Sequence, residues 1–315
     1  VLDGSWNRIV NNYIHDCNYK GVYAANIYIM GEHHLISHNT ITRSGRSLIS
    51  GNLGFLDCII QYNDMSLPMY QTKDGGAFYF SWTNGGNTEI RYNKIHNEGR
   101  FIGLYIDSNT HGILSHHNII YNCTGAAINL GNPNEYNSHI NNSTFNSGKI
   151  RKGTAIPKHA NNYFGTKIIK NIAQNGIYTG TNSTFLTNHS TSNPLPGYIN
   201  PGAQNFNLTA SSPAKDSGTV VPGITDGYIG TKPDKGALEY GAAEWTAGYV
   251  AGADPNPTYY LSNYIYKNHV KNPGFDTGNL NSWMKTGTQT ATLAYDPNQE
   301  GWKSVSTAQN TGPYS

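Results

Sequence analysis

Short segments that alternate apolar and polar residues recur through the first half of the chain. They read RIVNNYI, LISHNTI, IIQYNDM, EIRYNKI and LSHHNII, and this period-two alternation is typical of half-buried β-strands. Each copy carries an Asn at the same place, and a sixth, degraded copy follows with spacings of 27, 24, 30, 25 and 24 residues between successive Asn. The recurring residues are Asn12, Asn39, Asn63, Asn93, Asn118 and Asn142.

Apolar residues flank each Asn at fixed distances. An Ile stands three residues before the Asn in the first four copies, and Ile or Met stands two residues after it in the first five. The fifth copy departs at Ser115, and the sixth carries Phe145 one place late. The flanking residues are Ile9, Ile36, Ile60 and Ile90 before the Asn, and Ile14, Ile41, Met65, Ile95 and Ile120 after it.

A second strand is expected in most copies, and we align three segments for it: Gly21-Val22-Tyr23, Ala77-Phe78-Tyr79 and Gly103-Leu104-Tyr105. A coil of about 25 residues per turn stacks its rungs roughly 4.8 Å apart, so the Asn amides form an internal hydrogen-bonded ladder. We interpret this ladder as structural. A leucine-rich repeat would need an LxxLxL signature, and a propeller about 40 residues per blade. The pattern therefore predicts a parallel β-helix.

The composition agrees with an all-β protein rich in turns. Charged residues make up 13% and hydrophobic residues 37%, and Gly and Asn tolerate the left-handed backbone of tight turns. The formal charge of +2 gives no reason to expect a nucleic-acid or membrane partner. Cys17, Cys58 and Cys123 lack a CxxC spacing and are predicted to be free thiols, mostly buried. No apolar stretch reaches the length of a membrane-spanning helix.

Two groups of motifs resemble a known class of enzyme. KDGGAFYFSW and IGLYIDSNTHG, with the Asn-x-Ile ladder, resemble bacterial right-handed β-helix repeat proteins among glycoside hydrolases and polysaccharide lyases. Residues 193–240 resemble the closing segment of such enzymes, with SPAKDSG and PDKGALEYG. The resemblance implies a single-stranded right-handed parallel β-helix of the pectin-lyase type. It also implies a secreted or cell-surface bacterial protein that acts on a polysaccharide.

The tail carries a second resemblance. NHVKNPGFDTGNLNSWMK is similar to the opening strand of a β-sandwich carbohydrate-binding module, with Asp276 where Glu is usual. We therefore expect a β-helix over residues 1–240 that lacks its N-terminal rungs, a linker over 241–266 and the truncated start of a module over 267–315. Residues 149–192 are predicted to add two or three less regular rungs.

Ionisable residues concentrate just before the second strand of each rung. Hydrolysis of a glycosidic bond needs two carboxyl groups, and the three candidates are Asp74, Glu98 and Asp107. Asp74 and Glu98 fall on adjacent rungs, whereas Asp107 falls on the far side of its strand. Each has a structural alternative, because Asp-Gly, Glu-Gly and Asp-Ser-Asn are also turn sequences. Other members of this group, predicted to bind substrate, are Lys73, His96 and Arg100.

Aromatic side chains supply flat surfaces for sugar rings. Tyr79, Trp82 and Tyr105 are expected to bind substrate, with Tyr70 nearby, and Trp82 is predicted to be exposed in its polar loop. Tyrosine also favours strands, so some of these rings belong to ordinary packing. His33-His34 and His116-His117 lack a carboxylate at metal-ligand spacing, and no metal site is predicted.

Three functions remain open at this point. The first is a glycoside hydrolase with an Asp/Glu pair. The second is a polysaccharide lyase, in which Lys73 or Arg100 abstracts a proton and Ca²⁺ or an Arg neutralises the uronate; only then is a cofactor expected. The third is a non-catalytic glycan-binding or adhesive protein. In each case the partner is a polysaccharide and the protein is expected to be a monomer.

Overall fold

The structure is a computed structural model that forms two units, Val1–Ile265 and Tyr266–Ser315, each considered by itself. The residues that it describes are 1–20, 23–52, 54–99, 101–131, 133–152, 163–177, 184–186, 188–189, 196–255, 257, 291–296 and 301–306.

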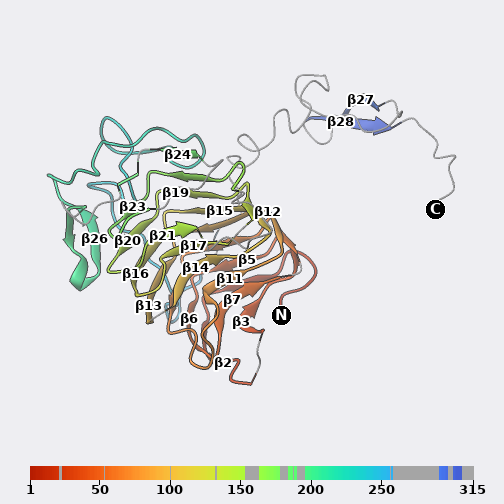
Figure 1. Cartoon of the computed structure of the whole chain (residues 1–315), viewed down its shortest axis with the longest axis horizontal. Coiled ribbons are helices and arrows are strands. Elements are labelled where there is room, and N and C mark those ends of the chain that lie inside the picture. Colours follow the sequence, from red (N-terminus) through yellow and green to blue (C-terminus); the bar gives the residue numbers. More distant parts are fainter. Residues whose placement is uncertain are drawn as a thin grey trace. The chain divides into compact units, whose positions relative to one another are not determined.

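Three parallel sheets run along the first unit, and each of the first six rungs of the coil gives a strand to each sheet (Figure 1). The first sheet contains β1 (Arg8–Val10), β5 (Leu35–Ser37), β9 (Ile59–Gln61), β12 (Asn84–Arg91), β15 (Thr110–His116), β19 (Ser138–Ile140), β22 (Lys167–Ile169) and β24 (Thr184–Leu186), with β18 (Asn134–Glu135) paired to β15. The second contains β2 (Tyr13–Cys17), β6 (Thr40–Ser44), β10 (Asp64–Ser66), β13 (Lys94–Gly99), β16 (Ile119–Cys123), β20 (Ser143–Phe145) and β23 (Ile172–Ala173). The third contains β3 (Ala25–Tyr28), β7 (Ser47–Gly51), β11 (Gly76–Phe80), β14 (Ile102–Ile106), β17 (Ile128–Leu130) and β21 (Ile150–Lys152); a small pair joins β4 (Gly31–Glu32) to β8 (Phe55–Leu56).

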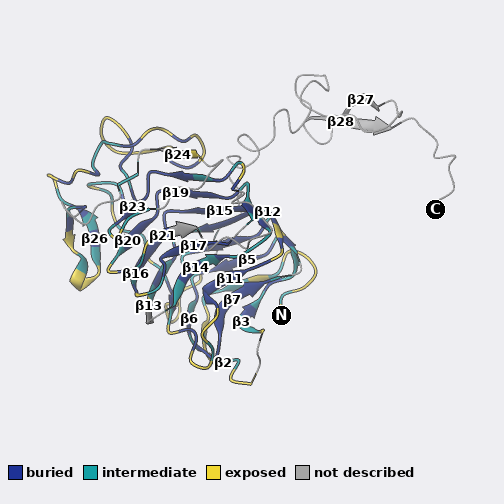
Figure 2. Cartoon of the chain, viewed as in Figure 1, coloured by how far each residue is buried: buried dark blue, intermediate teal, exposed yellow. Residues whose placement is uncertain are grey.

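The predicted register is confirmed for the first two sheets. Ile36 pairs with Ile9 and with Ile60, and Ile60 pairs in turn with Ile90. These side chains point into the coil, where stacked Ile, Leu, Phe and Met form one continuous core, so the strands are mostly buried (Figure 2). The predicted parallel β-helix is therefore present.

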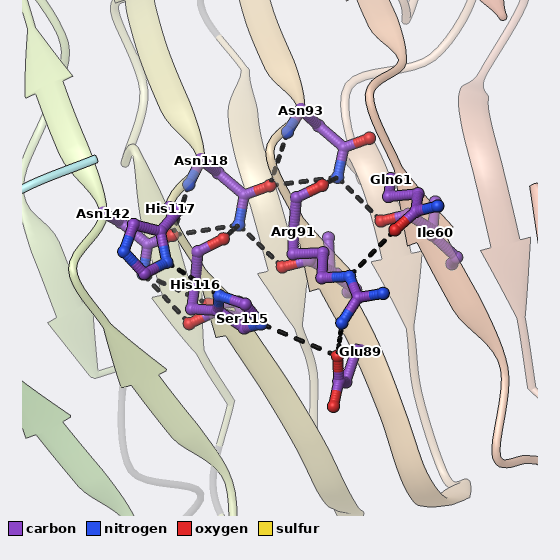
Figure 3. A network of polar contacts seen from close by, with 11 residues as sticks. Ile60, Gln61, Glu89, Arg91, Asn93, Ser115, His116, His117, Asn118 and Asn142 are labelled. Atoms are coloured by element: carbon purple, nitrogen blue, oxygen red, sulfur yellow. Dashed lines mark hydrogen bonds and ion pairs between the residues drawn. The ribbon is translucent and has the colours of Figure 1, made fainter. Parts of the chain in front are cut away.

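The Asn ladder is also present. Each ladder Asn donates its side-chain amide to Oδ1 of the Asn one rung on, at 2.9–3.0 Å from Asn12 to Asn142. The backbone N–H of the same Asn donates to that same oxygen, and Nδ2 also reaches a backbone carbonyl, as from Asn93 to Ile60 (Figure 3). Two further residues, Asn171 and Asn188, extend the ladder. They lie within residues 149–192, where two or three less regular rungs were predicted.

The residue before each ladder Asn turns the chain from the first sheet to the second. It adopts a left-handed backbone, with φ of 55° at His38, 53° at Tyr62, 52° at Tyr92 and 51° at His117. Because these corners superpose, the rings stack outside the coil with centroids 4.9–5.1 Å apart. Trp245 packs edge-on against Tyr62 and Tyr92.

Trp245 belongs to the segment predicted as a linker, and residues 244–253 contact the coil. Lys94 pairs with Glu244 at 2.7 Å, the Gly248 amide donates to the Tyr62 carbonyl, and Asn11 bonds Val250. Of the predicted carbohydrate-binding module, the described residues form one antiparallel hairpin, β27 (Ala291–Asp296) with β28 (Gly301–Ser306).

One alignment was wrong. The third-sheet strand of the first rung is β3 (Ala25–Tyr28), so Tyr28, not Tyr23, stands in register with Ser50 and Tyr79. Gly21 and Val22 lie outside the described residues. The reason is burial: Ile27 and Ile29 fill the core, whereas the ring of Tyr23 is exposed on a longer loop that the amide of Asn18 closes by donating to the Ala24 carbonyl.

Residues 196–240 cover the second sheet near its far end. The hairpin β25 (Tyr198–Asn200) and β26 (Asn205–Leu208) brings Phe206 against Tyr121, with ring centroids 5.0 Å apart. Buried Asp234, from the PDKGALEYG motif, accepts backbone amides from Asp216 and Tyr240, both at 2.6 Å. This carboxylate therefore organises the segment that the resemblance singled out.

Candidate functional site

The outer face of the third sheet carries a row of polar and aromatic residues. Phe78 and Phe80 point into the core, so the alternation turns Tyr79 outward, and Tyr105 lies beside it on the next rung. The two rings meet edge to face with centroids 5.3 Å apart. They form the centre of the candidate site.

Asp107 directly follows β14 and lies beside the tyrosine pair at the carboxyl end of the strands. Its Oδ2 accepts the hydroxyl of Tyr79 at 3.0 Å, and its Oδ1 accepts the backbone amide of Ser108 at 2.8 Å. The next rung has Gly131 at this place, where a Cβ would lie 2.5 Å from Oδ1. A glycine is therefore required for the carboxylate to fit.

Asp74 approaches the same row from the other end of β11, held by Arg46. The guanidinium of Arg46 is stacked between the rings of Tyr23 and Tyr79, 4.6 and 4.5 Å from their centroids. Its Nε donates to the Asp74 carbonyl at 3.0 Å, and its Nη2 lies 3.4 Å from Oδ2. The Arg46 residue is 2% exposed, whereas the side chain of Asp74 is 71% exposed. Arg46 is thus buried beneath the candidate site, and Asp74 lies at the surface of the site.

Asp107 contacts the Tyr79 hydroxyl directly, whereas Asp74 reaches this tyrosine only through Arg46. Burial raises the pKa of Tyr79 to about 12, and the charges of Asp107 and Asp74 add to the effect. Burial also raises the pKa of Tyr105, again with contributions from Asp107 and then Asp74. Both hydroxyls therefore stay protonated and act as donors at neutral pH. Asp74, before β11, and Asp107, after β14, thus border the tyrosine pair from its two ends.

Two more predicted residues border this surface. Trp82 is 69% exposed, as expected, on a left-handed corner with φ of 52°. Its backbone amide donates to the Ser108 carbonyl, which places it next to Asp107. Lys73 precedes Asp74 and is exposed.

Of the other predicted residues, the side chain of His96 is described, and it lies away from this cluster. His96 lies on the second sheet, where Nε2 is 2.6 Å from Asp64 Oδ1 and the ring stacks on Tyr121 with centroids 4.8 Å apart. Glu98 is on β13, of which only the backbone is described there, and Arg100 lies outside the described residues. The stack of ionisable residues expected before each third-sheet strand thus divides between two sheets.

A second polar cluster, on the outer face of the first sheet, was not predicted (Figure 3). Buried Glu89 pairs with Arg91 on the same strand and lies 3.6 Å from His116 Nε2, while His116 and His117 bond through their Nδ1 atoms at 2.8 Å. Burial lowers the pKa of His116, and burial and then the charge of His116 lower that of His117, so both rings are neutral at pH 7. The signal was available: EIRYNKI places Glu and Arg where the second and third copies carry Leu or Ile and Ser or Gln.

Other expectations concern metals, thiols and membranes. All three cysteines are free, Cys58 and Cys123 buried and Cys17 partly exposed. Within the described part of the chain, no three His, Cys, Asp or Glu side chains gather as metal ligands would. The same residues include no helix long and apolar enough to cross a membrane.

The strand pairing assigns the molecule to the class of parallel β-helix proteins, with a polar, aromatic site on one outer face. No protein-family model matches the sequence. No curated protein matches it either. Among solved structures, the pectate lyase Pel9A aligns over 68% of this chain and 67% of its own, with 15% identity and a TM-score of 0.46.

Proposed function

We propose that the protein is a glycoside hydrolase that cleaves a polysaccharide on the outer face of the third sheet, with Asp74 and Asp107 as its carboxyl pair. The observation that carries the proposal is that Tyr79 connects the two carboxylates: its hydroxyl donates to Asp107, and its ring lies against Arg46, which contacts Asp74. Two carboxyl groups on one accessible face are what acid-assisted cleavage of a glycosidic bond requires.

The surroundings of each carboxylate fit different roles. Asp107 is fixed by two donors, the Tyr79 hydroxyl and the Ser108 amide, which suits the member that attacks the anomeric carbon or activates water. Asp74 is exposed and held by one longer contact to Arg46, so its carboxyl is accessible to a bound chain, and we assign it the remaining role, protonation of the leaving oxygen. Glu98 remains a candidate for either role, from its place in the sequence.

The test is a comparison of Asp74→Asn and Asp107→Asn with the wild type on a panel of plant, algal and bacterial polysaccharides. We expect each variant to lose at least about a hundredfold in kcat, measured as new reducing ends, because each removes a proton-transfer group. Asp254→Asn, at an exposed aspartate, is the matched control. Full activity in both variants would refute the assignment of Asp74 and Asp107 as the catalytic carboxyl pair.

A lyase is the second candidate, favoured by the exposed Lys73 side chain next to Asp74. In that reaction the neutral amine of Lys73 removes the proton beside a uronate carboxyl, a double bond forms, and the glycosidic oxygen leaves from the neighbouring carbon and takes up a proton. Ca²⁺ or an Arg would neutralise the uronate carboxyl. The same panel separates the two, because a lyase product absorbs ultraviolet light at its new double bond. Binding without any cleavage would instead support an adhesive protein. Extracellular action and a bacterial source belong to this proposal.

A further inference from the structure

The corner between the second and third sheets is built from loops that stack over the first three rungs. The amide of Gly45 donates to the Cys17 carbonyl, and the amide of Gln71 donates to the Gly45 carbonyl, both at 3.0 Å. The loops approach so closely that a Cβ on Gly45 would lie 2.1 Å from the Asn18 oxygen. The corner is thus an ordered surface.

Three tyrosines on these loops present their rings to solvent. They are Tyr19, Tyr23 and Tyr70, and the rings of Tyr19 and Tyr70 lie with centroids 6.5 Å apart. A cluster of large exposed rings on a protein surface marks a binding site. The rings of Tyr23 and Tyr79 both lie against the Arg46 guanidinium, so the tyrosine patch continues into the candidate site.

A polar rim borders the patch and is internally neutralised. Arg43 donates to both carboxylate oxygens of Asp16, at 2.7 and 2.6 Å, and His15 lies 2.6 Å from the same carboxylate. The hydroxyl of Tyr19 donates to Asp16 at 3.3 Å, which orients its ring. Because Arg43 is paired with Asp16, and Arg46 with Asp74, the patch offers flat apolar faces and paired charges.

From this arrangement we infer that Tyr19, Tyr23 and Tyr70 form a binding subsite for the pyranose rings of the polysaccharide, whose chain runs across the corner to Asp74. The apolar face of a pyranose ring packs on an aromatic ring, and its hydroxyls meet the polar rim. The subsite recognises sugar rings by stacking and does not depend on a substrate carboxylate. This inference rests on the proposed function.

The test compares Tyr19→Ala/Tyr70→Ala with the wild type by affinity electrophoresis in gels that contain the cleaved polysaccharide, and by kinetics on the polymer and on a trisaccharide. We expect the affinity and KM for the polymer to worsen about tenfold, with kcat unchanged and no change on the trisaccharide. Tyr23→Ala should have a smaller effect in the same direction. Tyr228→Ala is the control, since Tyr228 is 37% exposed and Tyr19 38%.

A second variant separates stacking from other causes. Tyr19→Phe/Tyr70→Phe keeps both rings and should bind as the wild type does; a loss equal to that of the alanine variant would overturn the inference, as would wild-type affinity in the alanine variant. If the wild type binds a polysaccharide without cleaving it, the proposed function fails. The electrophoresis then still decides whether the subsite exists.

Discussion

The hydroxyl of Tyr79 donates a hydrogen bond to Oδ2 of Asp107 across one rung of the coil, over 3.0 Å. The ring of the same tyrosine lies against the guanidinium of Arg46 from the rung before. One side chain therefore connects the buried cation to the carboxylate that we propose as a catalytic group. Three consecutive rungs contribute to this arrangement, so the register of the coil sets the geometry of the site.

Replacing Tyr79 with Phe tests that connection. The variant keeps the ring over Arg46 but removes the hydroxyl that donates to Asp107 Oδ2. A hydrogen bond to a charged group is worth about 1.5–3 kcal/mol, so we expect kcat to fall about ten- to a hundredfold with a small change in stability. Tyr28→Phe, on the same row two rungs earlier, should leave kcat unchanged. Unaltered kcat in Tyr79→Phe would show that the hydrogen bond has no role in the reaction.

Arg46 offers a comparison between a buried and an exposed arginine at one corner. Arg46→Met leaves two rings without their cation and Asp74 without its anchor, so the free energy of unfolding should fall by about 2–4 kcal/mol, measured by chemical denaturation. Arg46→Lys should be intermediate, because an ammonium cannot stack and donate as a planar guanidinium does. Arg43→Met removes an exposed pair with Asp16 and should cost much less. Equal losses at both sites would contradict the role given to the Arg46 sandwich.

The Asn ladder makes a separate prediction about stability. Asn63→Ala, at a fully buried rung, removes both amide bonds and leaves the neighbouring Asn39 amide without its acceptor, so we expect a loss of about 3–5 kcal/mol in the free energy of unfolding. Asn12→Ala, at the exposed end of the ladder, should cost about 1 kcal/mol. Thermal unfolding monitored by circular dichroism measures both. Similar losses would mean that burial does not set the ladder's contribution.

Most of the fold could be predicted from the sequence because the coil repeats itself. Each ladder Asn follows a left-handed corner and is flanked by core residues. Because every rung repeats this geometry, similar residues recur at these positions in every copy. The signal also exists for Asn171 in KIIKNIA, with Ile168 three residues before it, although the spacing of 29 from Asn142 obscured it. The first-rung error arose where repetition stops. The first rung contains two similar dipeptides, Val22-Tyr23 and Ile27-Tyr28. Only the burial of Ile27 identifies the second as part of the third-sheet strand.

The site was predictable only in part. Tyr79 and Tyr105 meet because β11 and β14 pair in register, and Asp107, at the end of β14, reaches the Tyr79 hydroxyl. The contacts of the buried Arg46 could not be predicted from residue spacing, since it reaches Asp74 and Tyr23 through loops of unequal length. His96 was misplaced for a related reason: it still belongs to a second-sheet strand, where its side chain meets Asp64.

The pH dependence of stability is expected to depend on Glu239, in the segment that covers the second sheet. Burial raises the pKa of Glu239 from 4.5 to about 7, while the nearby Lys170 opposes the shift. The folded protein therefore holds a proton that the unfolded chain has released, and the free energy of unfolding should fall as the pH rises from 4.5 to about 7. Since solvent screens a half-buried group, we expect a fall of about 1–2 kcal/mol.

Glu239→Gln should remove this fall, because the amide does not ionise. Lys170→Met should make the fall in stability steeper, because Glu239 then ionises without a cation nearby. Burial lowers the pKa of Lys170 from 10.5 to about 8, so the wild type should also gain stability as the pH rises between these values. Lys170→Met should abolish this gain. Chemical denaturation at half-unit steps of pH measures both slopes, with Glu32→Gln at the opposite end of the coil as control. A wild-type slope retained in Glu239→Gln would assign the pH dependence to another group.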